Sequence, residues 1–237
     1  ALILGFAAGY LANWIKGWKV PSYIKPLMPI FVIPIVTSMV VGLFYIYVLA
    51  NPLGGVVLGL ENFLANMGTG STVVLAIIIG LMIAFDMGGP VNKVAFTFAA
   101  GMIASGRPEI MGMTGVAICV PPIGMGLASF ISKSRFTNEE REAGKAALAM
   151  GTIGITEGAI PFAAADPLRV LPAIMIGSAV GAVIAALGQA TNLAPHGGLI
   201  VLPVVGNSLW YIAGVIVGSL VVVGIILLLK KPIVVSE

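Results

Sequence analysis

Glu157 is the residue of this chain that most needs a chemical explanation. It lies in the stretch GITEGAIPFAAADPLR (residues 154–169) and is the only charged side chain from Ala146 to Ala165. A charge inside a membrane span costs at least about 2.5–3.5 kcal/mol on insertion scales. A carboxylate accepts hydrogen bonds from adjacent hydroxyl groups, which suits a sugar, and it suits a coupling ion equally well. A third interpretation is structural: protonation or backbone N–H groups satisfy the carboxylate and hold a hairpin closed.

His196, in the stretch NLAPHGGLIVLP, is the only histidine of the chain. The proline before it and the two glycines after it favour a turn. As a hydrogen-bond donor and acceptor, its imidazole suits the recognition of hydroxyl groups; the alternative is a histidine that simply lies at the membrane interface. No second histidine and no clustered carboxylates accompany it in the sequence, so we predict no metal site.

The stretch FDMGGPVNK carries Asp86, Asn92 and Lys93 between two short apolar runs. Gly-Gly-Pro predicts a turn at this point. Asp86 and Lys93 could form an ion pair across that turn and stabilise it. Alternatively, Asn92 could reach a ligand.

Two further charged segments favour structural roles. Asp166 and Arg169 are three residues apart at a predicted helix start, with Pro167 in the first turn, and so we expect them to pair. In the polar run FTNEEREAGK, we expect Thr137 or Asn138 to cap a solvated helix. A docking surface is the alternative for that run.

Several enzyme motifs are absent from the sequence. It contains no Walker loop, no G-x-S-x-G elbow, no H-E-x-x-H and no C-x-x-C. The single cysteine, Cys119, lies in the apolar run GVAICVPPIG, where we expect it to pack as a small hydrophobic side chain. We therefore predict no cofactor, and any chemistry at Glu157 or His196 needs groups from another protein.

The composition places these residues in a membrane protein. Of 237 residues, 59% are hydrophobic and only 9% are charged, whereas soluble domains carry roughly 25% charged residues. Because so few charges cannot cover a water-facing surface, we predict an all-α, polytopic transmembrane protein. The net charge of +3 comes from short basic clusters between apolar runs, as in cytoplasmic loops, so we expect lipid contact and no nucleic-acid partner.

Long apolar stretches mark the elements that position the polar residues. A helix needs roughly 20 apolar residues to cross the hydrocarbon core. The opening stretch ALILGFAAGYLANWIKGWK reads as the end of a transmembrane helix that begins upstream, Pro52–Met67 as an interfacial amphipathic helix, and Pro121–Pro122 as a break within a span. The expected spans or part-spans are 28–50, 71–85, 91–105, 110–131, 146–165, 170–190 and 209–229.

The basic residues also predict an orientation. With the Lys16–Lys25 loop in the cytoplasm, alternating crossings return the basic run 133–145 to the cytoplasm, as the positive-inside rule requires. The lysines at 230–231 should also be cytoplasmic, but three full crossings after residue 145 would place them outside. We therefore predict that the Glu157 segment, interrupted by glycines and Pro161, is a re-entrant hairpin. Such broken segments are tolerated only where they are buried in protein or line a cavity, and in transporters they usually carry the substrate site.

Four stretches, in order along the chain, resemble one family. They are AFDMGGPVNKVAFTF, FTNEEREAGKAA, GITEGAIPFAAADPLRVLPAIMIGSAVGA and APHGGLIVLP. Together they are similar to the membrane-embedded IIC component of the fructose-type sugar permeases of the bacterial phosphoenolpyruvate-dependent phosphotransferase system. The resemblance runs from about residue 1 to about residue 231, which we expect to form one membrane domain with a tail at 232–237.

The resemblance implies a function that the residues alone leave open. Such permeases bind a sugar, carry it across the bacterial inner membrane and present it to a IIB domain, which receives its phosphoryl group through IIA. A cysteine of IIB is the donor, and Cys119 does not match it, so this chain is expected to carry no phosphorylated residue. Related permeases are homodimers with re-entrant hairpins. An ion-coupled sugar transporter, with Glu157 as the coupling site, is the alternative.

The resemblance also implies site residues. A glutamate in a G-I-T-E-like segment and a histidine contact the sugar in the wider superfamily, and these positions correspond to Glu157 and His196. Either residue could also act as a general base on the hydroxyl that is phosphorylated. We add Thr156, Asn92 and Asp86 to the expected sugar-binding residues. Fructose is the expected sugar, with mannose, mannitol-like and mannosylglycerate-type substrates among relatives, and the C-terminus is expected in the cytoplasm.

Overall fold

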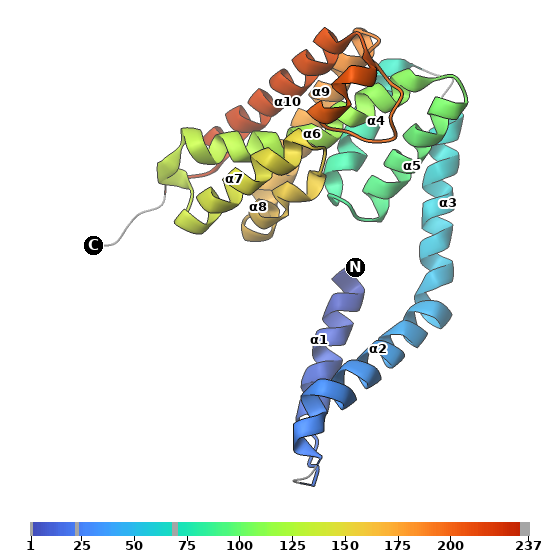
Figure 1. Ribbon diagram of the computed structural model, residues 1–237, viewed down its shortest axis with the longest axis vertical. Coiled ribbons are helices and arrows are strands. Elements are labelled where there is room, and N and C mark those ends of the chain that lie inside the picture. The colour runs from blue at the N-terminus through green and yellow to red at the C-terminus, as the bar shows by residue number, and fades with distance from the viewer. Residues whose placement is uncertain (1, 22–23, 68–70, 233–237) are drawn as a thin grey trace. The chain divides into compact units, whose positions relative to one another are not determined.

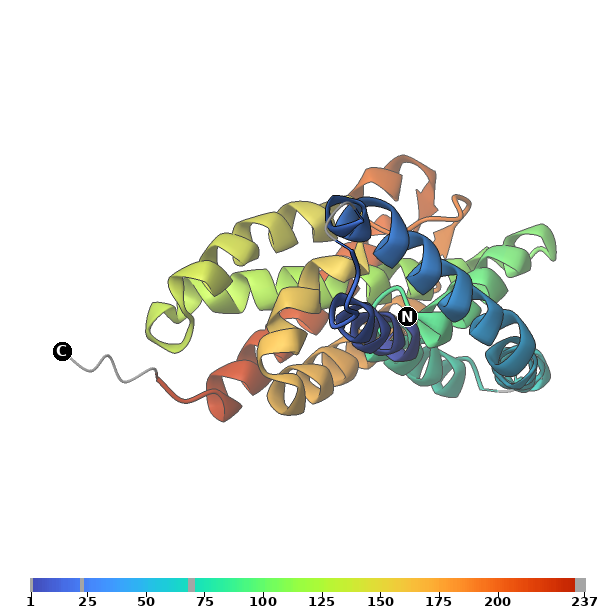
Figure 2. The ribbon, with the colours of Figure 1, turned by 90° about the horizontal axis from the view of Figure 1, so that it is seen from below.

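The chain folds into helices joined by short loops. The computed structural model describes residues 2–21, 24–67 and 71–232. Apart from one two-residue strand pair, its regular elements in these ranges are helical, as Figures 1 and 2 show. The predicted all-α fold class is therefore confirmed. The chain divides into two compact units, residues 1–59 and 60–237.

The first unit contains α1 (Leu2–Lys16) and a long apolar helical run. The run consists of η1 (Lys25–Leu27), η2 (Met28–Val32), α2 (Ile33–Phe44), η3 (Tyr45–Leu49) and the start of α3 (Ala50–Met67). Helix α1 packs against α2. A proline lies in the first turn of η1, where its missing N–H costs no helical hydrogen bond. Prolines also lie at the start of η2 and of α2, inside the continuous run. The span predicted at 28–50 is therefore confirmed as helix, and α3 shows that Pro52–Met67 is helical; its interfacial position remains a prediction.

The second unit is organised around one long central helix, α6. Helix α6 (Pro108–Ile131) packs against α4 (Thr72–Phe85), α5 (Pro90–Ala104), α7 (Asn138–Thr152) and the two long helices that follow. Those are α9 (Pro167–Leu187) and α10 (Ser208–Leu229), and the short α8 (Ile160–Ala165) precedes them. In its most apolar window, 78% of α6 is buried inside the protein. It is therefore the core element on which the other helices of this unit are placed.

Helix α6 continues through Pro121 and Pro122, so the predicted break at this pair is wrong. Both prolines lie inside a regular α-helix. A proline at position 121 cannot donate to the carbonyl of Ala117 four residues earlier. The buried Ser178 hydroxyl of α9 donates to that carbonyl at 3.2 Å. A neighbouring helix thus supplies a hydrogen bond that the backbone lacks, which is how membrane helices tolerate proline.

Helices α9 and α10 approach closely through paired glycines. Gly177 and Gly181 lie four residues apart on α9, as Gly214 and Gly218 do on α10. A Cβ added to Gly214 would lie 2.7 Å from the carbonyl oxygen of Gly181, and one on Gly218 would lie 2.7 Å from that of Gly177. Small residues at this spacing let helix backbones pack closely in membranes. The sequence contains this signal, but it was not among the predicted features.

Four helical runs in the described part of the chain are long and apolar enough to cross a membrane. They are Lys25–Pro52, Pro108–Ile131, Pro167–Leu187 and Ser208–Leu229. These correspond to four of the predicted spans. Helix α4 is apolar but shorter, as expected, and the span predicted at 146–165 is divided between α7 and α8.

The glycine pairs predict a position-dependent response to one added methyl group on α10. We expect Gly214→Ala to destabilise the protein by about 1–3 kcal/mol, the usual cost of overpacking, because its Cβ would press on the Gly181 carbonyl. Gly224→Ala on the same helix meets nothing within 4 Å and should be neutral or stabilising by up to about 1 kcal/mol, since alanine favours helix. Thermal unfolding in detergent compares them, and equal effects of both would rule out the glycine contact as a stabilising feature.

Candidate functional site

The segment that carries Glu157 is a helical hairpin with a broken tip. Helix α7 ends at Thr152, and Gly154 follows with a φ of +84°, which an L side chain rarely adopts. The chain then forms the short helix η5 (Thr156–Ala159), which contains Glu157, and enters α8 with Pro161 in its first turn. The predicted interruption of the helix is therefore confirmed. Its re-entry into a membrane remains a prediction.

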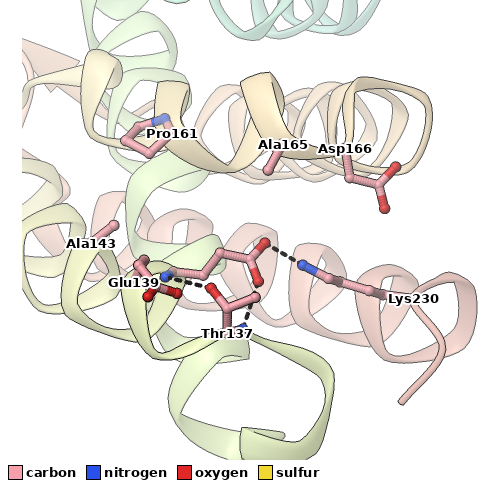
Figure 3. Close-up of a pocket in the computed structure, with 8 residues that line it drawn as sticks. Thr137, Glu139, Ala143, Pro161, Ala165, Asp166 and Lys230 are labelled. Carbon is pink, nitrogen blue, oxygen red and sulfur yellow. Dashed lines mark hydrogen bonds and ion pairs between the residues drawn. The ribbon is translucent and has the colours of Figure 1, made fainter. Parts of the chain in front are cut away.

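The two arms of this hairpin lie side by side. Helix α8 contacts α7, and η5 packs against α6 and α7. Figure 3 shows Pro161 and Ala165 of α8 facing the Thr137 and Ala143 side of α7. Residues 153–158 therefore form the tip of the hairpin, at the C-terminal end of α7.

The Glu157 carboxylate is half-buried and unpaired. No hydrogen bond or ion pair reaches it from any residue that the structure describes. This contradicts the structural interpretation in which backbone N–H groups hold the carboxylate. An acceptor without a protein donor, at a broken helix, is instead available to hydrogen-bond donors of a ligand.

Glu157 contacts a second turn, which joins α4 to α5. A Cβ added to Gly88 would collide with Oε1 of Glu157. Gly88 has a φ of +92°, so this position needs glycine both for its backbone conformation and for the space that Glu157 occupies. The tip of the α7–α8 hairpin and the α4–α5 turn are therefore in direct contact.

The side chains of the α4–α5 turn hold the turn together. Asp86 accepts hydrogen bonds from the backbone N–H groups of Val91 and Asn92, each at 2.8 Å. The buried Asn92 side chain donates to the carbonyl oxygen of Ile83 at 2.6 Å. Lys93 does not pair with Asp86 but lies over the Phe96 ring, 5.8 Å from its centroid. The expected Asp86–Lys93 pair is thus replaced by a backbone cap, and sugar contacts of Asp86 and Asn92 remain predictions.

His196 brings a third turn to the same tip. A ring nitrogen of His196, Nε2, is 2.7 Å from the carbonyl oxygen of Ile153. A Cβ on Gly154 would also collide with the backbone of Gly197, and one on Gly198 would approach Gly154 N at 2.7 Å. The predicted turn at His196 is confirmed: it lies between β1 (Thr191–Asn192) and β2 (Val205–Gly206), which pair antiparallel, and it includes η6 (Leu199–Val204).

Thr156, like Asn92, is buried. It lies at the start of η5 beside Glu157 but is only 4% exposed. The three turns therefore gather Glu157 and His196 at one tip, with Asp86 and Asn92 just behind the second turn. The sequence identified these residues but not Ile153 or Gly88. Ile153 contributes the carbonyl group that His196 contacts, and Gly88 leaves the space that Glu157 occupies. The Gly88–Gly89 pair was the sequence signal from which the second contribution could have been found.

The Asp166–Arg169 pair and the helix cap at Thr137, both expected from the sequence, are present in the structure. Arg169 donates to Asp166 at 2.7 Å. Thr137 caps α7 and accepts from the Glu140 N–H, while the Glu140 carboxylate accepts from the Thr137 N–H, forming a capping box. Hydrogen bonds from its own backbone N–H, and then from Thr137, lower the pKa of the exposed Glu139 carboxyl.

One cavity lies away from the Glu157 tip, between the other parts of α7 and α8. It has a volume of about 490 Å³. Figure 3 shows its walls and Lys230 at one end. The residues that line it are Thr137, Glu139, Glu140, Ala143, Pro161, Ala165, Asp166 and Lys230. It includes none of the expected sugar-binding residues, and so we place the candidate site at the three turns.

Lys230 ties the end of α10 to the start of α7. Its ammonium group forms an ion pair with Glu140, and the two side chains are only 11% and 12% exposed. The same group lies 4.2 Å from the centroid of the Phe136 ring, which in turn packs edge-to-face on Phe162 of α8 at 6.0 Å. The sequence gave no indication of this pair, because 90 residues separate its members.

Comparison with known proteins assigns these features to one family. Residues 1–177 match the family model described as phosphotransferase system, EIIC. The chain is 50% identical over 231 residues to the fructose-like permease IIC component 2 of Escherichia coli, covering 98% of this chain and 64% of that protein. It is 44% identical to the PTS system fructose-specific EIIB'BC component of Rhodobacter capsulatus (95% and 40% covered) and 39% identical to the EIIABC component of Bacillus subtilis (98% and 37% covered).

The chain therefore spans between 37% and 64% of the length of these three relatives. No solved structure matches it significantly. The family match and the four long apolar helices in the described residues together support a multi-pass membrane protein.

The buried position of the Lys230–Glu140 pair predicts a large effect of removing one partner. We expect Lys230→Met to destabilise the protein by about 3–5 kcal/mol, because the Glu140 charge would stay largely buried without a cation. Lys145→Met is the matched control: Lys145 pairs with Glu142, but these side chains are 61% and 70% exposed, so the loss should be about 0–1 kcal/mol. Thermal unfolding of both variants tests this, and a Lys230 variant as stable as the Lys145 variant would contradict it.

Proposed function

The chain belongs to the EIIC family of the phosphotransferase system, and on that premise we propose that it is a sugar permease of group translocation. It binds a sugar at the three turns, translocates it across the bacterial inner membrane and presents it to a phosphodonor domain. We propose fructose as the sugar, because two of these relatives are named fructose-specific and the third fructose-like. IIB and IIA domains are the proposed partners, since the names EIIB'BC and EIIABC place B and A parts in the same chains as C.

The unpaired, half-buried carboxylate of Glu157 is the observation that carries the proposal. A sugar presents several hydroxyl donors, and a carboxylate with no protein donor accepts two or more of them. The imidazole of His196, held at the same tip through Ile153, adds a second group that can bond a hydroxyl. Hydrogen-bonding groups that converge at a small site give this kind of polar selectivity.

The phosphoryl transfer requires little covalent chemistry from this chain. In the proposed step, the S–P bond of the donor's phosphocysteine breaks and an O–P bond to the sugar hydroxyl forms. The hydroxyl proton passes to Glu157 or His196, and the donor cysteine leaves as a thiolate. Positioning and charge stabilisation supply most of such a transfer, and a general base contributes roughly 10²–10⁴-fold.

Cys119 is an unsuitable phosphoryl carrier in this proposal. It is fully buried in α6, donates to the carbonyl of Gly115 at 3.1 Å and accepts from the N–H of Gly198 at 3.2 Å. We propose that no residue of this chain is phosphorylated. We also propose that the permease is a homodimer with a cytoplasmic C-terminus.

Ion-coupled transport is the weaker alternative. Glu157 could bind a proton or cation, but the family match provides no support for this mechanism. Among the residues that the structure describes, no group of three His, Cys, Asp or Glu side chains gathers to hold a metal ion. The alternative is therefore retained only as an outcome of the transport experiment.

Glu157→Gln separates sugar binding from base catalysis. Glutamine keeps a hydrogen-bonding side chain of similar size but cannot take a proton. If Glu157 is the base, phosphoenolpyruvate-dependent phosphorylation of fructose should fall by roughly 10²–10⁴-fold, while fructose affinity should change far less. Both are measured on full-length permease with its donor proteins, and Glu142→Gln, on the exposed face of α7, is the matched control.

Two results would contradict parts of this account. Equal losses of binding and phosphorylation would remove the base role from Glu157 and leave it a binding residue. A Glu157→Gln permease that matches the Glu142→Gln control in both assays would place the sugar elsewhere.

A further inference from the structure

The turn that carries His196 is held by buried side chains from three different elements. The first is Asn192 of β1, which is 0% exposed. Its Nδ2 donates to the carbonyl oxygen of His196 at 2.7 Å, and its Oδ1 accepts from the N–H of Ala194 at 2.9 Å. One amide side chain thus closes the turn on both sides of Pro195.

The other two side chains fix the glycines that follow His196. Tyr211 of α10 donates its hydroxyl hydrogen to the carbonyl oxygen of Gly198 at 3.1 Å, and Cys119 of α6 accepts from the Gly198 N–H at 3.2 Å. Both side chains are 0% exposed. Because buried polar groups are costly to leave without partners, these bonds oppose displacement of the turn.

The hydrogen bond between the His196 ring and Ile153 fixes the ring and also determines which ring nitrogen carries the hydrogen. The Ile153 carbonyl oxygen, 2.7 Å from Nε2, can only accept a hydrogen bond. Nε2 must therefore carry the hydrogen. In neutral imidazole the other nitrogen, Nδ1, is then the acceptor. No residue that the structure describes bonds to Nδ1.

We propose that Asn192 and Tyr211 are positioning residues that, with the Ile153 carbonyl, hold His196 as the Nε2–H tautomer and leave Nδ1 as the atom that accepts a substrate hydroxyl. The substrate part rests on the proposed function. The tautomer part stands on the hydrogen bonds alone. Because Ile153 lies on the tip that also carries Glu157, the same bond fixes the two substrate-facing groups relative to one another.

The single histidine of the sequence makes the tautomer directly measurable. Full-length permease is labelled with ¹⁵N-histidine, purified without a histidine tag and recorded by long-range ¹H–¹⁵N correlation. The resonances of His196 are those lost in His196→Gln. We expect the Nε2–H pattern near neutral pH, and we expect added fructose to shift Nδ1 more than Nε2.

Tyr211→Phe tests the positioning role with little change in packing. It removes one hydroxyl and keeps the buried ring, whereas Tyr10→Phe, at a side chain that is 77% exposed, is the matched control. We expect Tyr211→Phe to raise the KM for sugar by about 3–10-fold, the size expected from one lost hydrogen bond, and to mix the His196 tautomers. Asn192→Asp, which keeps the acceptor but loses the donor to His196, should do the same. Neither effect is expected from Tyr10→Phe.

The outcomes separate this proposal from the proposed function. An Nδ1–H tautomer in the wild type overturns the proposal whether or not sugar binds. An Nε2–H tautomer that no hexose perturbs overturns the substrate part and the proposed function together, and leaves the tautomer assignment standing. Tyr211→Phe and Asn192→Asp proteins that keep both the wild-type KM and the wild-type tautomer overturn the positioning role.

Discussion

The carboxylate of Glu157 occupies its place because Gly88 has no side chain. A Cβ on Gly88 would collide with it, and a Cβ on Gly154 would collide with Gly197. Three turns far apart in the sequence thus meet at glycines, and the space between them has no room for a further side chain. The positions of Glu157 and His196 depend on this close approach, and any larger side chain at these contacts would push the turns apart.

Helix α6 makes that approach possible by holding the elements behind all three turns. It packs against α4, α5 and α7, which lead into two of the turns, and against β1 at the base of the third. Its Cys119 sulfur accepts from Gly198 in the His196 turn. A buried helix that carries the turns at its periphery is a suitable base for a binding site, because binding groups are held more precisely by helices than by loops alone.

Much of the fold could be predicted from sequence because hydrophobic length is a strong signal. Most apolar helices begin and end within a few residues of the predicted boundaries, whereas the span predicted at 146–165 is divided among α7, η5 and α8. The break near Gly154 was predicted from the glycines of this segment. The continuity of α6 through Pro121 could not be predicted, because the hydrogen bond that compensates for it comes from Ser178 on another helix. The Lys230–Glu140 pair was equally invisible, since only the tertiary fold brings the ends of α10 and α7 together.

The site was partly predictable, because polar residues stand out in an apolar sequence. A charge in an apolar run and a lone histidine in a turn stand out in sequence, so Glu157 and His196 were identifiable. The Asp86–Lys93 pair was expected from opposite charges, but backbone N–H groups at the start of α5 offered Asp86 closer partners. The Ile153 carbonyl carries no sequence signal, because every residue has one. The Gly88–Gly89 pair predicts a turn, but the sequence does not show that Glu157 occupies the space beside Gly88.

The most direct test of the account is uptake of labelled fructose into vesicles that carry the full-length permease, with phosphoenolpyruvate and the donor proteins inside. Gly88→Ala is compared with Gly106→Ala, whose glycine also has a positive φ but meets nothing within 4 Å. The account predicts fructose phosphate inside vesicles of the wild type and of the Gly106 variant, dependent on a complete donor chain, and little with Gly88→Ala. Free fructose accumulating with an ion gradient and no donor, or full activity of the Gly88 variant, would contradict it.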